Sequence, residues 1–220
     1  TGRIAPMTTT FAFIGFGEAG QYLSKGLQGE GAVVSAAYDI LFDAPDGGGA
    51  KGDAVRTALA ERGIPAAATP AAVVAGADIA ISAVTAKQVA AAGNAAGPHM
   101  QPGQIFLDIN SASPGAKRDA SRAVIAAGAD YVEAAVMSNV PPHGHRVPMF
   151  LAGKAAVRAA ALMSPLGMKV EVVGTEINGP VNESLSPIIK LIACCQAAHS
   201  GELSVESSVG RKKGISAPKV

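Results

Sequence analysis

One short stretch, FIGFGEAG at residues 13–20, constrains the fold more than any other part of the sequence. The run TFAFIGF at 10–16 is apolar and rich in phenylalanine, as expected of a strand that is buried on both faces. After the glycines, Ala19, Leu23 and Leu27 recur every four residues, which is helical spacing. The glycines therefore lie where a strand turns directly into a helix.

The alternation of strand and helix continues along most of the chain. Apolar runs predict further strands at 32–38, 66–69, 78–84, 104–109, 131–136, 147–151 and 169–173. Helices are predicted at 19–28, 54–62, 70–75, 86–95, 114–127 and 154–166, and the Gly- and Asp-rich residues 43–53 are predicted to form a loop. This pattern predicts a mainly parallel, doubly wound α/β sheet of Rossmann type as one domain over residues 8–175. Residues 176–220 are predicted to hold a helix, at about 186–200, and a tail.

The three glycines have the G-x-G-x-x-G spacing that binds dinucleotides when it stands between a strand and a helix. In that setting Gly15 permits the tight turn, Gly17 lets the main chain approach a pyrophosphate, and Gly20 lets helix and strand pack closely. The helix N-terminus adds unpaired N–H groups and a partial positive charge. The alternative is a purely structural glycine turn.

Asp39 follows Gly20 by nineteen residues, at the end of the second predicted strand. A carboxylate there can accept hydrogen bonds from the ribose hydroxyls of an adenosine. It would repel the additional phosphate of NADP, and the next residues, Ile-Leu-Phe at 40–42, supply no arginine to offset that repulsion. The sequence therefore favours NAD over NADP, unless Asp39 only caps a loop.

Three motifs in this order, FAFIGFGEAG, LDINSASP at 107–114 and YVEAAVMSNVPP at 131–142, resemble the β-hydroxyacid dehydrogenases. That family includes 6-phosphogluconate and 3-hydroxyisobutyrate dehydrogenases, and the resemblance covers about residues 8–195. Relatives usually read D-A-P-V-S-G-G after the sixth strand, where Ser-Gly-Gly holds the substrate carboxylate. Here Met137 takes the place of that serine, and Ser138 and Asn139 take the place of the glycines. The resemblance implies a substrate-anion site of altered shape.

The resemblance also implies a catalytic lysine. Relatives carry a G…K-x-x-x-N pattern on a long helix, and Gly179 and Lys190 match its glycine and lysine, whereas Cys194 replaces the asparagine. Spacing of four puts Cys194 on the same helix face as Lys190. Lys190 would then take the hydroxyl proton of the substrate as hydride leaves its carbon. The alternative is a lysine that snorkels from an amphipathic helix.

Further contacts are expected at the carboxyl edge of the sheet, where this fold class binds its ligands. Residues 83–85 end the fourth predicted strand, and Asn110 follows the fifth, where it could instead cap a helix. The complete set expected to contact the cofactor is Gly15, Phe16, Gly17, Glu18, Ala19, Gly20, Asp39, Ala83, Val84, Thr85 and Asn110.

Composition and residue spacing argue against several other classes of protein. With 18 basic and 17 acidic residues the formal charge is +1, which gives no general field to attract nucleic acid or an anionic membrane. The adjacent Cys194 and Cys195 are poorly placed to staple a fold and favour a reducing, cytoplasmic setting. His143 and His145 lack a third ligand of suitable spacing, so no metal is expected, although either could approach a substrate. Residues 1–7 lack the apolar core of a signal peptide.

The sequence thus predicts an NAD-dependent oxidoreductase that acts on a small hydroxy acid. The resemblance implies that residues 176–220 begin an all-helical domain that in relatives closes the cleft and usually forms a homodimer. Two alternatives stay open. One is a related imine or ketone reductase, which would use NADPH. The other is a protein that binds NAD as a sensor or assembly factor without turnover, favoured by Cys194 and by the short stretch after the long helix.

Overall fold

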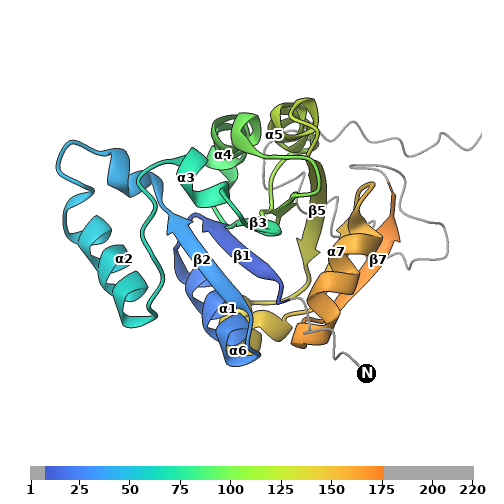
Figure 1. Cartoon of the computed structure of the whole chain (residues 1–220), viewed down its shortest axis with the longest axis horizontal. Coiled ribbons are helices and arrows are strands. Elements are labelled where there is room, and N and C mark those ends of the chain that lie inside the picture. The colour runs from blue at the N-terminus through green and yellow to red at the C-terminus, as the bar shows by residue number, and fades with distance from the viewer. Residues whose placement is uncertain (1–7, 176–220) are drawn as a thin grey trace, which may run out of the picture.

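The computed structural model of the protein describes residues 8–175. Within them, seven strands form one sheet in the order β2-β1-β3-β4-β5-β6-β7 (Figure 1). The strands are β1 (Thr10–Ile14), β2 (Val33–Tyr38), β3 (Ile79–Ser82), β4 (Ile105–Asp108), β5 (Asp130–Val136), β6 (Met149–Ala152) and β7 (Val170–Gly174). Neighbouring strands pair in parallel except β5 and β6, which are antiparallel. The mainly parallel, doubly wound sheet predicted from the sequence is confirmed.

Helices connect the strands. The α-helices are α1 (Glu18–Gly29), α2 (Gly49–Glu61), α3 (Pro70–Val74), α4 (Val89–Ala96), α5 (Pro114–Ala126), α6 (Val140–His143) and α7 (Ala156–Met163). Short 3-10 turns are η1 (Ile40–Asp43), η2 (Ala86–Gln88), η3 (Gly97–His99), η4 (Gly144–Arg146) and η5 (Ser164–Leu166). Local sequence explains where several of them begin. The Ser113 hydroxyl, for example, accepts a hydrogen bond from the Ala116 N–H at 3.2 Å, and Pro114 occupies the first helical position of α5.

Two apolar layers enclose the sheet because side chains alternate between its faces. Phe11 and Phe13 of β1 point to the layer beneath α1, α2 and α7, whereas Ala12 and Ile14 point to the layer beneath α3, α4 and α5. Phe106 of β4 likewise lies in the second layer, where it stacks on Tyr131 with 5.5 Å between ring centroids. Burial on both faces explains why these strands read as continuous apolar runs.

The order of strands creates a switch point beside β1. From β1 the chain moves outward to β2 and then crosses back to β3 on the other side of β1. The carboxyl ends of β1 and β3 therefore lie side by side, with Ile14 paired to Ser82. In open α/β sheets the crevice at such a point is where ligands bind.

The structure corrects two local predictions. The expected strand at 66–69 is reduced to one isolated bridge, Ala37 to Ala66, because Pro65 and the helix that begins at Pro70 leave no room for a ladder. Residues 43–53 are not all loop, since α2 begins at Gly49. The glycines there allow close packing: a Cβ on Gly52 would lie 1.9 Å from the Gly47 carbonyl oxygen.

Candidate functional site

The glycine loop between β1 and α1 leaves bare main chain at the start of a helix. Gly15 has φ +84°, and a Cβ there would lie 2.3 Å from the Ala83 carbonyl oxygen. Gly17 is the N-cap of α1, without a side-chain hydrogen bond to cap the helix, and a Cβ on it would meet open space. A Cβ on Gly20 would lie 3.0 Å from the Gly15 carbonyl oxygen. The unpaired N–H groups of the first turn of α1 therefore face outward at Gly17, where an anion can approach them.

Asp39 ties this loop to the end of β2. Its Oδ2 accepts a hydrogen bond from the Phe16 N–H at 2.9 Å, and its Oδ1 accepts one from the Leu41 N–H at 3.1 Å. The residue is only 8% exposed, and the Phe16 ring is fully buried against Phe13. Asp39 thus caps η1 and holds the glycine loop in place. Its side chain also lines a cavity that lies next to η1 and the glycine loop.

That cavity measures about 610 Å³ and follows the carboxyl edge of the sheet from β2 to β3. This is within the usual range for a ligand pocket, about 300–1,000 Å³. Its far wall consists of small apolar side chains, Ala91, Ala92 and Ala95 of α4, which a flat aromatic ring can pack against. Of the residues expected to contact the cofactor, the cavity brings together Gly15, Gly17, Glu18, Ala19, Asp39, Ala83, Val84 and Thr85. Phe16, Gly20 and Asn110 do not line it.

Asn110 acts on the cavity through Val84. Its Oδ1 accepts a hydrogen bond from the Val84 N–H at 2.7 Å, and its Nδ2 donates to the Ser82 hydroxyl and to Asp108 Oδ1. The residue is 6% exposed. Its amide is therefore engaged within the protein and fixes the loop after β3, and direct contact with a cofactor stays a prediction.

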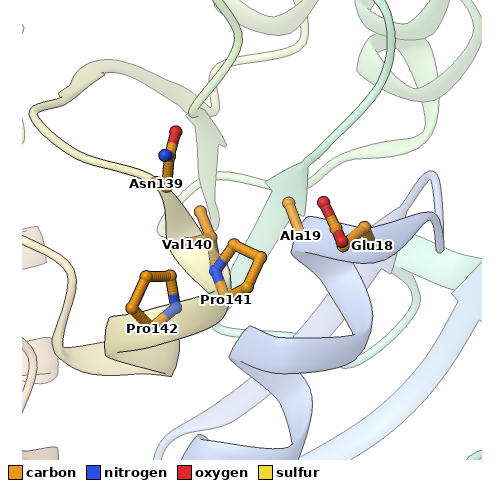
Figure 2. Close-up of a pocket in the computed structure, with 6 residues that line it drawn as sticks. All are labelled: Glu18, Ala19, Asn139, Val140, Pro141 and Pro142. Carbon is orange, nitrogen blue, oxygen red and sulfur yellow. The ribbon is translucent and has the colours of Figure 1, made fainter.

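A second cavity, of about 460 Å³, adjoins the first across the start of α1 (Figure 2). Glu18 and Ala19 line both cavities. The opposite wall is the start of α6, where Figure 2 shows Val140 and Pro141 between the Asn139 amide and the first turn of α1. Of the three residues predicted to contact the substrate after β5, only Asn139 lines this cavity. Ser138 is exposed beside it, and the Met137 N–H donates to the Pro148 carbonyl at 2.9 Å.

The sequence did not indicate a buried cluster of charged side chains near the carboxyl end of β4, formed by Lys117, Asp108 and Glu133. Lys117 of α5 is 2% exposed, and its Nζ lies 3.2 Å from Glu133 Oε1 and 3.7 Å from the fully buried Asp108 Oδ2. The Tyr131 hydroxyl donates to Asp108, and burial followed by the Asp108 charge raises the pKa of Tyr131, so this phenol remains a donor. The available signal was that Lys117 falls on the apolar stripe of its helix, with Ala120 and Val124.

His145 does not line either cavity. It is buried against α1, where a Cβ on Gly26 would lie 1.9 Å from its Nδ1, and its Nε2 lies 3.7 Å from Glu30 Oε1. Burial, and then the neighbouring Arg146, lower the pKa of His145. Its ring therefore joins the loop after β5 to the helix that begins at the glycine loop.

Two predicted site residues, Lys190 and Cys194, lie outside the described residues. Within residues 8–175, no group of three or more His, Cys, Asp and Glu side chains is arranged to hold a metal ion. In the same part of the chain, no helix has the length and apolar character needed to span a membrane.

A glycine-loop cavity at the switch point of a doubly wound sheet defines a dinucleotide-binding domain. Residues 10–174 match the family model of the NAD binding domain of 6-phosphogluconate dehydrogenase, and the chain belongs to this family. The predicted kinship with the β-hydroxyacid dehydrogenases is confirmed. None of the curated proteins compared with the chain matches it.

Solved structures agree with this assignment. A conserved hypothetical protein from Sinorhizobium meliloti 1021 is 38% identical, with a TM-score of 0.71, over 78% of this chain and 56% of its own. The conserved protein MTH1747, of unknown function and structurally similar to 3-hydroxyacid dehydrogenases, is 27% identical, with a TM-score of 0.61, over 76% of this chain and 58% of its own. An imine reductase from Myxococcus stipitatus in complex with NADP+ shares the fold at 19% identity and a TM-score of 0.62, over 87% of this chain and 62% of its own. The chain thus spans less than two thirds of the length of these structures.

Proposed function

We propose that this chain supplies the nucleotide-binding part of an NAD-dependent oxidoreductase that transfers a hydride between nicotinamide and a small hydroxy acid. The observation that carries the proposal is the pair of adjoining cavities that meet at the start of α1. An extended dinucleotide can reach from one cavity into the other past Glu18 and Ala19, which line both. Its pyrophosphate is best stabilised between them, where the N–H groups of α1 are unpaired.

The residues present fit such a cofactor. The first cavity offers an apolar wall for adenine and the Asp39 carboxylate at the end of β2 for ribose hydroxyls, and Gly17 leaves room for the pyrophosphate. When bound, the cofactor supplies a ring carbon that accepts or donates hydride. The second cavity, bordered by Asn139, is the place for the group that reacts with that ring.

Proton transfer is assigned to Lys190, as the family resemblance implies. In the oxidising direction the substrate loses hydride from its carbinol carbon and a proton from its hydroxyl, and the lysine amine accepts that proton. In the reducing direction its ammonium returns the proton to the carbonyl oxygen. Asn139 supports the proposal because its amide can donate a hydrogen bond to a substrate oxygen at the border of the second cavity.

NAD is favoured over NADP because every charged side chain that lines the first cavity is acidic. These are Glu18, Asp39 and Asp43, and among the described lining residues there is no lysine or arginine to receive a 2′-phosphate. This argues against the NADPH-dependent imine reductase alternative. A cytoplasmic location and a homodimer formed through residues 176–220 belong to the same proposal.

The test is NADH formation by the full-length protein over a panel of small hydroxy acids, followed by absorbance. We expect turnover with at least one acid and a loss of about 100-fold or more in kcat for Lys190→Ala, the usual contribution of a general base. NAD binding without turnover by any member of the panel would favour the sensor alternative. Turnover that survives Lys190→Ala would remove the lysine from the proposal.

A further inference from the structure

A second carboxylate, Asp43, borders the first cavity next to Asp39. Asp43 is the last residue of η1, the turn that follows β2, and it lines the cavity together with Tyr38 and Leu41. Asp43 is exposed to solvent, whereas Asp39 is buried, with only 8% of its surface exposed. The two carboxylates differ in what they are free to do.

Asp39 is committed to the main chain. Each of its oxygens already accepts a hydrogen bond from a main-chain N–H, one from Phe16 in the glycine loop and one from Leu41 in η1. A buried carboxylate that joins two loops in this way acts first on the shape of the cavity. Its loss should weaken every dinucleotide that depends on the glycine loop.

A tyrosine at the end of β2 holds the Asp43 side chain in place. The hydroxyl of Tyr38, a residue that is 6% exposed, donates a hydrogen bond to Asp43 Oδ2. Burial, and then the hydrogen bond to Asp43, raise the pKa of Tyr38, so the phenol stays protonated and keeps donating at neutral pH. The Tyr38 ring packs edge-on against Phe42, with 6.4 Å between centroids. Asp43 is thus an exposed carboxylate on a fixed support.

Arg56, the basic side chain that packs on the neighbouring Phe42, is turned to other partners. Arg56 lies over the Phe42 ring, 4.8 Å from its centroid, and donates to the Gly47 carbonyl and to Asp53. It does not line the cavity. The negative charge of Asp43 is therefore left without a basic neighbour on the cavity side among the described residues.

From these contacts we infer that Asp43, and not Asp39, is the side chain by which this cavity rejects a dinucleotide that carries a phosphate on its adenosine ribose. Tyr38 is the positioning residue that holds it. The inference rests on the proposed function, because it assumes that the first cavity takes the adenosine half of a nicotinamide dinucleotide. It changes the sequence-based interpretation, in which Asp39 carried this discrimination.

The experiment is calorimetric titration of the full chain with NAD and with NADP at low and high salt. For Asp43→Asn we expect NADP affinity to rise about fivefold at low salt, the size of one exposed charge–charge interaction, and NAD affinity to change less than twofold. High salt should remove most of the gain. Tyr38→Phe should give a smaller gain in the same direction. Asp39→Asn should weaken NAD and NADP by similar factors.

Asp46→Asn is the matched control. Asp46 lies three residues after Asp43, is also exposed, and accepts a hydrogen bond from the Gly48 N–H at 3.0 Å, but it does not line the cavity. It should leave both affinities unchanged. The inference is overturned if Asp43→Asn leaves the ratio of the two affinities within twofold of wild type, or if Asp39→Asn alone improves NADP binding. In both cases NAD binding by the wild type keeps the proposed function intact, whereas a wild type that binds neither dinucleotide overturns both.

Discussion

Replacing Lys117 by methionine should destabilise the protein far more than breaking a shorter ion pair on its surface. Methionine keeps the length and apolar stem of the side chain but removes the charge that lies 3.7 Å from Asp108 and 3.2 Å from Glu133. The Asp108 carboxylate is fully buried, so the variant leaves a negative charge in the protein interior without its cation.

The expected magnitude follows from burial. Removing one partner of a buried ion pair costs about 3–5 kcal/mol. Asp108 retains hydrogen bonds from Tyr131 and from the main chain and side chain of Asn110, which places the cost near the lower end of that range. A loss of about 3 kcal/mol lowers the melting temperature of a domain of this size by roughly 6–12 °C.

The assay is thermal unfolding followed by circular dichroism, with Arg122→Met as the control. Arg122 and Asp119 lie closer together, at 2.8 Å, but their side chains are 76% and 49% exposed. Solvent screening should hold the effect of Arg122→Met to about 2 °C or less. The reasoning is refuted if Lys117→Met melts within about 2 °C of wild type, or if the two variants lose equal stability.

Three further predictions concern α1 and its neighbours. Gly26→Ala should cost about 1–3 kcal/mol in denaturant unfolding, because its Cβ meets the buried His145 ring, and adding His145→Ala should restore part of the loss. Because the folded pKa of His145 is lowered while Glu30 and Arg146 face it, the unfolded chain takes up the proton first. The free energy of unfolding should therefore fall as the pH drops from about 6.5 towards the lowered pKa of His145. His145→Asn should flatten this part of the profile. The same substitution at the exposed His143 is the control and should leave the profile as it is. Glu18→Gln should tighten NAD binding about two- to fivefold at low salt, since it removes a negative charge from the helix end that faces the pyrophosphate; weaker binding in calorimetry would contradict this.

Much of the fold could be predicted because its strands are buried on both faces. The apolar runs around Phe11 and Phe106 are continuous, and the glycine motif marks the first strand-to-helix turn without ambiguity. The bridge at Ala66 was predicted as a strand because apolar composition alone cannot show whether a neighbour is available for pairing. Glycine-rich composition usually indicates a loop, which is why residues 49–53 are not predicted as helix; in the structure Gly52 lies within α2 and allows it to pack closely on Gly47.

The part of the candidate site that consists of main chain, the glycine loop, could be predicted from the sequence. The side-chain contacts between residues that are distant in sequence could not. Gly15 and Gly17 occupy the positions that their spacing implies, because the turn itself fixes them. Asp39 accepts a hydrogen bond from the Phe16 N–H, 23 residues away in sequence, and Asn110 accepts one from the Val84 N–H, 26 residues away. Local patterns carry no information on such pairings, and for the same reason the partners of Lys117 were not foreseen.

The most direct test of the account is NAD titration of a Gly17→Val variant beside Gly29→Val. Both glycines belong to the α1 segment, and a Cβ on either meets open space, so both variants should melt close to wild type. Only Gly17 borders the cavity. We predict that Gly17→Val lowers NAD affinity by at least about tenfold while Gly29→Val leaves it unchanged. A folded Gly17→Val protein that binds NAD as tightly as wild type would show that the dinucleotide does not lie against the start of α1.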